Sequence, residues 1–150
     1  MIAFITGAAH GQGRAVALDA LLTWYPLHDQ VAPVLGERRT WLFCHAISTA
    51  SDCLICSTFF RRLIIDAGED PGELALDEFD ELIVDFGRRL GTDPHSVDEE
   101  LRARLSARFS DSEIVLLTGF GAIMVATNVV NDALGVPLDS YLEPYRARVA

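Results

Sequence analysis

Apolar residues recur at intervals of three and four positions through most of the chain after residue 13, whereas strict alternation of apolar and polar residues is nearly absent. This spacing is typical of helices that bury one face, because an α-helix completes a turn in 3.6 residues. The pattern predicts an all-α fold. We expect a single domain over residues 14–150, preceded by a glycine-rich N-terminal arm at residues 1–13.

Two local signals predict where helices begin, and prolines and glycines predict where they end. Ser96 with Glu99, and Ser110 with Glu113, fit the capping box, in which a hydroxyl and a carboxylate satisfy backbone N–H groups at a helix start. The stretch Ile114 to Leu134 is apolar on nearly every side, which predicts a long buried central helix. The other helices are expected at residues 14–24, 27–35 after a break at Pro26, 38–49, 53–67 and 74–90, with a short helix or arm at 138–150.

The net charge of −10 arises from 22 acidic and 12 basic residues, and every basic residue is an arginine. A polyanion would be repelled, so we expect no nucleic acid partner. The absence of lysine excludes Schiff-base chemistry. No signal-peptide pattern stands at the N-terminus and no apolar stretch runs uninterrupted for the length of a membrane span, so the expectation is a cytoplasmic protein without a membrane partner.

Residues 5–14 match the T-G-x-x-x-G-x-G turn with which short-chain dehydrogenases bind a dinucleotide phosphate. That fold requires a second strand ending in an acidic residue about twenty positions later, where this chain has a helical pattern instead. The dehydrogenase motif Tyr-x-x-x-Lys cannot occur without a lysine. We therefore interpret the segment as an arm or loop, and no cofactor is expected.

Cys53 and Cys56 form a C-x-x-C pair at the predicted start of a helix. One helical turn brings the two sulfurs together, and the helix dipole stabilises a thiolate on the first cysteine. With Cys44 as a spare thiol, this odd set favours a redox pair over a disulfide framework. The alternative to a redox pair is that both cysteines are small, buried, apolar residues that happen to lie three positions apart. A zinc site that adds Cys44 and His45 is disfavoured, because adjacent helical residues point about 100° apart; no metal is expected.

The helix order, the C-x-x-C pair, and the stretches Phe109–Val115 and Asn131–Leu138 together resemble the carboxymuconolactone decarboxylase superfamily, in its alkylhydroperoxidase D-like (AhpD-like) branch, over roughly residues 20–145. The resemblance implies an AhpD-like all-α domain that assembles into a homo-oligomer, a trimer or hexamer. It also implies a dithiol that reduces peroxides or exchanges electrons with a partner protein thiol or a lipoyl group. In that family the second cysteine, here Cys56, usually attacks the peroxide, whereas the helix dipole favours Cys53.

The peroxidases of this family relay protons through a histidine four residues after the second cysteine and a glutamate on the preceding helix. This chain has Phe60 at the histidine position and Trp41 at or near the glutamate position. His45, one helical turn after Trp41, is our candidate for a substitute relay. Asp52 is expected to be the N-cap of the thiol helix rather than a base, and its charge would raise the pKa of Cys53.

Two other functions remain as alternatives. A non-catalytic, small-molecule-binding helical oligomer would line an apolar pocket with Trp41, Phe59 and Phe60. A carboxymuconolactone decarboxylase-like enzyme acting on a small organic acid would use Arg61 or Arg62 to hold a carboxylate. Family members with that activity generally lack the cysteine pair, which argues against it here.

Overall fold

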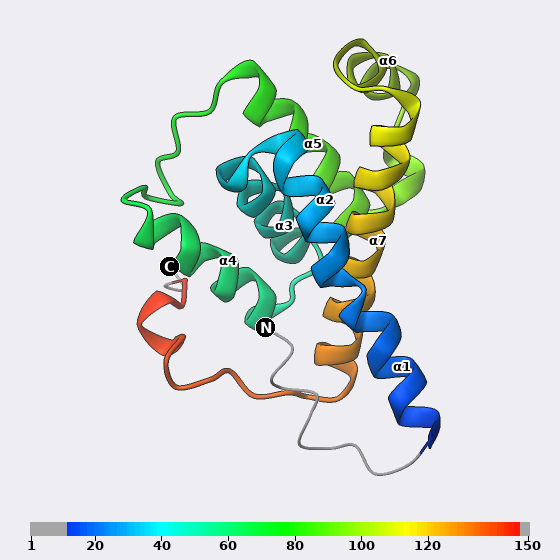
Figure 1. The fold of residues 1–150 in the computed structure, drawn as a ribbon. Helices are drawn as coiled ribbons and strands as arrows, with labels where there is room; N and C mark the ends of the chain where they lie inside the picture. The colour runs from blue at the N-terminus through cyan, green and yellow to red at the C-terminus, as the bar shows by residue number, and fades with distance from the viewer. Residues whose placement is uncertain (1–11, 148–150) are drawn as a thin grey trace.

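The structure is a computed structural model that describes residues 12–147, with side chains from residue 16 (Figure 1). All regular structure within these residues is helical, which confirms the predicted all-α class. The elements are α1 (Gln12–Leu22), α2 (Trp24–Leu35), α3 (Glu37–Ala50), α4 (Leu54–Asp66), α5 (Glu78–Thr92), η3 (Pro94–Ser96), α6 (Glu99–Arg108), α7 (Asp111–Ala133) and η4 (Glu143–Tyr145), where η marks a short 3₁₀-helix.

Helix α3 lies at the centre of the fold. It packs against α2, α4, α5 and α7, and Figure 1 shows it enclosed by these neighbours. Phe43, Cys44 and Ile47 of α3 are fully buried in the hydrophobic core. The central position therefore belongs to α3, although the sequence predicts it for the most apolar helix, α7.

Helix α7 is as long as predicted, but only one of its faces is buried. Leu117, Phe120 and Met124 face the core, against α2, α3 and α5. On the other face Val115 is 72% exposed and Val129 is 59% exposed. By length and composition α7 would also pass as a membrane span, a test that core helices of soluble proteins pass as well.

One of the two predicted capping boxes is present in the structure. The Ser110 hydroxyl oxygen accepts a hydrogen bond from the N–H of Glu113, and the Ser110 N–H donates one to the Glu113 carboxylate, which confirms the capping box of α7. The box predicted at Ser96 is wrong, because Asp98 caps α6 instead. The break predicted at Pro26 lies at residue 23 instead, where the chain turns between α1 and α2. Pro26 is accommodated in the first turn of α2.

The segments predicted at the two ends of the chain lie partly outside the described residues. The glycine-rich segment 5–14 and the arm predicted at 1–13 lie almost entirely outside the described residues, and α1 begins at Gln12. Of the terminal helix predicted at 138–150, the structure shows only the 3₁₀-helix η4, and residues 148–150 are not described.

Helices α3 and α5 approach closely because α5 presents two glycines to α3. A Cβ atom at Gly87 would lie 2.9 Å from the carbonyl oxygen of Phe43. A Cβ atom at Gly91 would overlap the carbonyl oxygen of Ile47 and lie 3.0 Å from the Cβ of Ala50. Since residues four apart share one helix face, the two glycines make a continuous contact surface, and Gly91 continues α5 where a helix end was predicted.

A buried carboxylate ties the first turns of the same two helices together. The side chain of Asp80 is only 3% exposed, and it accepts hydrogen bonds from Arg38 Nη1 at 2.5 Å and Arg39 Nε at 2.7 Å. Asp80 also completes the capping box of α5 with Asp77. Arg38 extends the network through a bidentate pair with Glu69 at 2.7 and 2.8 Å.

Replacing Gly91 by alanine should destabilise the fold, because the new Cβ would force α3 and α5 apart. We expect the free energy of unfolding to fall by about 1–3 kcal/mol, the usual cost of overpacking. Gly119→Ala is the matched control: its Cβ would meet open space, so stability should rise by up to about 1 kcal/mol. Urea denaturation measures both changes, and a Gly91→Ala protein as stable as the wild type would contradict the packing argument.

Asp80→Asn should cost about 2 kcal/mol or more of unfolding free energy. A fully buried ion pair costs roughly 3–5 kcal/mol when broken, but here both arginines are partly exposed and keep Glu69 and Asp77 as partners. Glu81→Gln, an exposed change in the same helical turn, should cost less than about 1 kcal/mol. Equal losses in the two variants, measured by urea denaturation, would show that Asp80 has no special role.

Candidate functional site

The turn between α3 and α4 places the cysteine pair at the start of α4. Cys53 is the N-cap residue of α4, and its N–H donates to the carbonyl of Ser48 at 3.0 Å. Asp52 adopts a left-handed backbone conformation with φ of 56°, so the prediction that Asp52 caps the helix is wrong. Cys56 lies in the first turn of α4, and both cysteine side chains are 0% exposed in the single chain.

The two thiols interact directly, and their pKa values move in opposite directions. Hydrogen bonding from Cys56 lowers the pKa of Cys53 and outweighs the cost of burial. The same interaction raises the pKa of Cys56 strongly, and burial adds to that increase. The arrangement therefore favours a thiolate on Cys53 with a protonated Cys56 beside it.

Helix α7 contributes a buried amide to this pair. Asn131 Nδ2 donates to the sulfur of Cys56 at 3.2 Å, an interaction that lowers the pKa of Cys56 and opposes the larger shift. The side-chain oxygen of Asn131 is buried and has no hydrogen-bond partner among the described residues. A buried amide oxygen without a partner is costly, so this oxygen is an available acceptor for a hydrogen-bond donor near Cys56.

A second asparagine, one turn earlier on α7, braces the α3–α4 turn. Asn128 Nδ2 donates to Ser51 Oγ at 2.6 Å and lies 3.4 Å from Ser48 Oγ. Neither asparagine is among the site residues predicted from the sequence. The signal that could have found them is the presence of two amides three residues apart on the buried face of an otherwise apolar helix.

Asp132 links the buried pair to the surface. Its side chain is exposed, and both its charge and a hydrogen bond raise the pKa of Cys53, against the effect of Cys56. The neighbouring Leu54 is 40% exposed. Cys53 itself is 0% exposed, although Leu54 next to it in the chain and Asp132 on α7 reach the surface.

The surroundings of His45 differ from those of the cysteine pair. Burial and the nearby charge of Arg61 lower the pKa of His45 to about 4, and its side chain lines a cavity that includes neither cysteine. The charge interactions that shift the pKa values of the two thiols do not involve His45. The structure thus brings together Cys53 and Cys56 but gives the substitute relay no support.

Phe60 and Trp41, together with Phe59, belong to the core or its edge. Phe60 is buried and its ring centroid lies 6.4 Å from that of Trp24. Trp41 and Phe59 are half-buried and pack against the same core. Phe60 therefore fills space instead of lining an open pocket.

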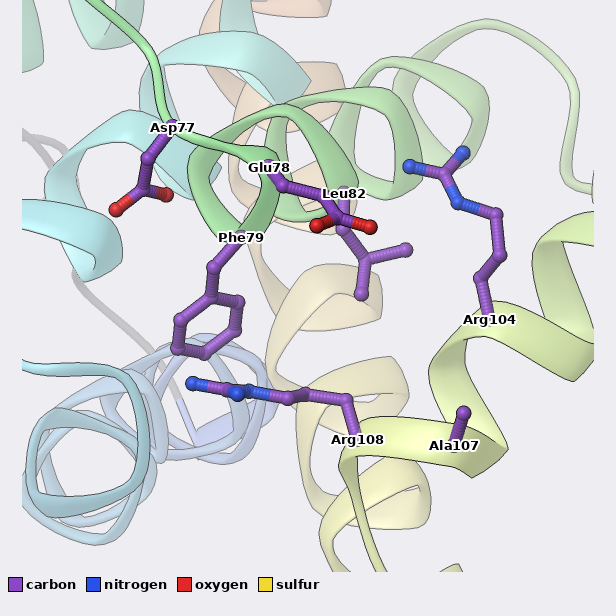
Figure 2. Close-up of a pocket in the computed structure, with 7 residues that line it drawn as sticks. All are labelled: Asp77, Glu78, Phe79, Leu82, Arg104, Ala107 and Arg108. Carbon is purple, nitrogen blue, oxygen red and sulfur yellow. The ribbon is translucent and has the colours of Figure 1, made fainter.

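A cavity of about 430 Å³ lies between the first turn of α5 and α6 (Figure 2). Figure 2 shows Arg104 and Arg108 projecting from α6 toward α5. The guanidinium group of Arg108 lies 4.1 Å from the centroid of the Phe79 ring, and that of Arg39 lies 4.3 Å from it. The lining also contains Asp77 and Glu78, so basic and acidic groups balance one another there and favour no particular ligand.

No group of three or more histidine, cysteine, aspartate or glutamate side chains suited to a metal ion occurs within residues 12–147. Comparison of the chain with protein-family models, with curated proteins and with solved structures found no match. The resemblance to the alkylhydroperoxidase D-like proteins therefore stays a prediction.

Proposed function

We propose that this chain is a C-x-x-C thiol oxidoreductase of the alkylhydroperoxidase D-like kind, and that it works as a homo-oligomer. The observation that supports the proposal is the asymmetric thiol pair: Cys53 at the N-cap of α4 has a lowered pKa, and Cys56 has a raised one. Two inert buried thiols would both have raised pKa values, as burial alone gives Cys44.

The asymmetry assigns a role to each sulfur. The Cys53 thiolate attacks the terminal oxygen of a hydroperoxide, the O–O bond breaks, and the departing alkoxide takes a proton from solvent to leave as the alcohol. Cys53 is then a sulfenic acid. Cys56 attacks that sulfur, the S–O bond breaks, and hydroxide leaves as water with the Cys56 proton. Two thiols and one peroxide thus give a disulfide, an alcohol and water.

The cycle closes through an external dithiol, a protein thiol or a lipoyl group, which reduces the disulfide by exchange. This assignment reverses the order usual in the resembled family, where the second cysteine attacks first. The reason is local: Cys53 receives a hydrogen bond from Cys56, whereas that same interaction and burial both destabilise a thiolate on Cys56.

Access to the pair requires movement, because neither sulfur is exposed in the single chain. The most favourable place for that movement is the α3–α4 turn, where Asp52 holds a left-handed conformation that non-glycine residues rarely adopt. Asp52 and Leu54 flank Cys53 and are exposed. Opening of this turn would expose Cys53 before Cys56, which agrees with the order assigned from the pKa values.

Maleimide labelling against pH should distinguish the two thiols. With lowered pKa, the thiolate of Cys53 persists below the free-cysteine value of about 8.5, so Cys53 should react at neutral pH. Cys56 has a raised pKa and should react only at higher pH, at least about tenfold more slowly at pH 7. Mass spectrometry of the Cys53→Ser and Cys56→Ser variants measures each rate separately.

The reaction of the two thiols with peroxide is the second measurement. Peroxide must remove both thiols reversibly in the wild type, and the Cys56→Ser variant must accumulate a sulfenic acid on Cys53 that dimedone traps. Cys44→Ala is the control, because this thiol is buried with a raised pKa and its loss should leave both steps unchanged. Faster labelling of Cys56, or no loss of the pair with peroxide, would contradict the proposal.

Asn131→Leu should slow disulfide formation without slowing the first attack. The variant removes the N–H donor that lowers the pKa of Cys56, so we expect about a tenfold slower second step, the effect of one hydrogen bond. Thiol loss and dimedone trapping after a peroxide pulse measure the two steps. The control is Thr127→Val, because the Thr127 hydroxyl is buried on α7 but donates only to Ile123; equal slowing in both variants would indicate a purely structural effect.

A further inference from the structure

A second cavity, of about 500 Å³, lies between α3, α5 and the segment that leads into α5. This volume is within the range of small-molecule binding sites in proteins. Neither cysteine contributes to it, so it is separate from the thiol site. Its walls are mainly apolar and consist of Leu42, Ala46, Ala50, Pro71, Leu74, Leu76 and Val84.

The charge of this cavity's lining is opposite in sign to the net charge of the chain. Among residues 12–147, no aspartate or glutamate lines it, although the chain has 22 acidic and 12 basic residues. The only charged residue in the lining is Arg88, on an exposed position of α5. An adjoining hollow contains Glu81 and Asp85. Asp85 is paired with Arg89 and Arg104. Arg88 makes no ion pair within residues 12–147.

His45 supplies a second polar group from α3. Because burial and the charge of Arg61 keep its pKa near 4, the imidazole is neutral at pH 7 and offers one donor and one acceptor. The hydrogen bonds found within residues 12–147 include none to its ring. A half-buried imidazole in an apolar wall is more stable when a ligand or water occupies its polar atoms.

We propose that this cavity binds a monocarboxylate with an apolar chain, its carboxylate on Arg88 and its body against the leucine and valine walls. A neutral apolar ligand would leave Arg88 and His45 without partners, and a cation would be repelled by Arg88. A multiply charged anion would find only one cationic side chain. Binding here does not depend on the thiol chemistry, so the two proposals can fail separately.

The test uses octanoate as the probe and octanamide as its uncharged analogue, with binding followed by calorimetry and by the imidazole resonances of His45. Octanoate should bind saturably with a Kd below about 1 mM, and octanamide about tenfold more weakly because it cannot form the charge-assisted contact with Arg88. Arg88→Gln should weaken octanoate binding by about tenfold and leave octanamide unaffected. Arg102→Gln, an exposed arginine on α6 outside the cavity, is the matched control.

Two further variants show where the probe binds. Leu76→Trp fills the cavity and should abolish octanoate binding without changing any charge. The Cys53→Ser, Cys56→Ser double variant should bind octanoate as the wild type does. No saturable binding up to about 5 mM, equal affinity for the amide, or unchanged affinity in Arg88→Gln would each overturn the proposal.

Discussion

Gly87 and Gly91 let the backbone of α5 lie directly against carbonyl groups of α3, and this contact fixes α3 in the middle of the molecule. Close packing of two helix backbones leaves little freedom for either helix to slide or rotate. The Asp80 carboxylate, held between Arg38 and Arg39, fixes the same pair at their first turns. Charge and shape therefore act together on one helix pair.

Because α3 is fixed, the thiol site and the cavity that it supports are fixed as well. Its last turn supplies the Ser48 carbonyl that receives the Cys53 N–H, which sets the start of α4 and the spacing of the thiols. A different face of α3 carries Leu42, His45 and Ala46 into the large apolar cavity. The thiol site and the cavity are thus separate features supported by one element.

The thiol pair combines two opposing effects of the protein interior. Burial raises the pKa of a thiol, as it does for Cys44, whereas a hydrogen bond between neighbouring thiols stabilises a thiolate on one at the expense of the other. Asn131 and Asp132 of α7 modify the balance from the buried side and the surface side. A thiolate can therefore be stabilised on one sulfur of a pair that is closed off within the core.

Local sequence accounts for the helical class, the capping of α7 by Ser110 and the position of the cysteine pair at the start of a helix. These features depend on residues within a few positions of one another, so periodicity and capping chemistry describe them. The tertiary packing of the helices sets the central position of α3, the burial of α7 on one face and the place of His45 in a cavity wall. It also brings Asn131 to Cys56 across 75 positions of sequence. Such contacts depend on how helices pack, and helix packing depends on which side chains meet across an interface, which no local pattern specifies.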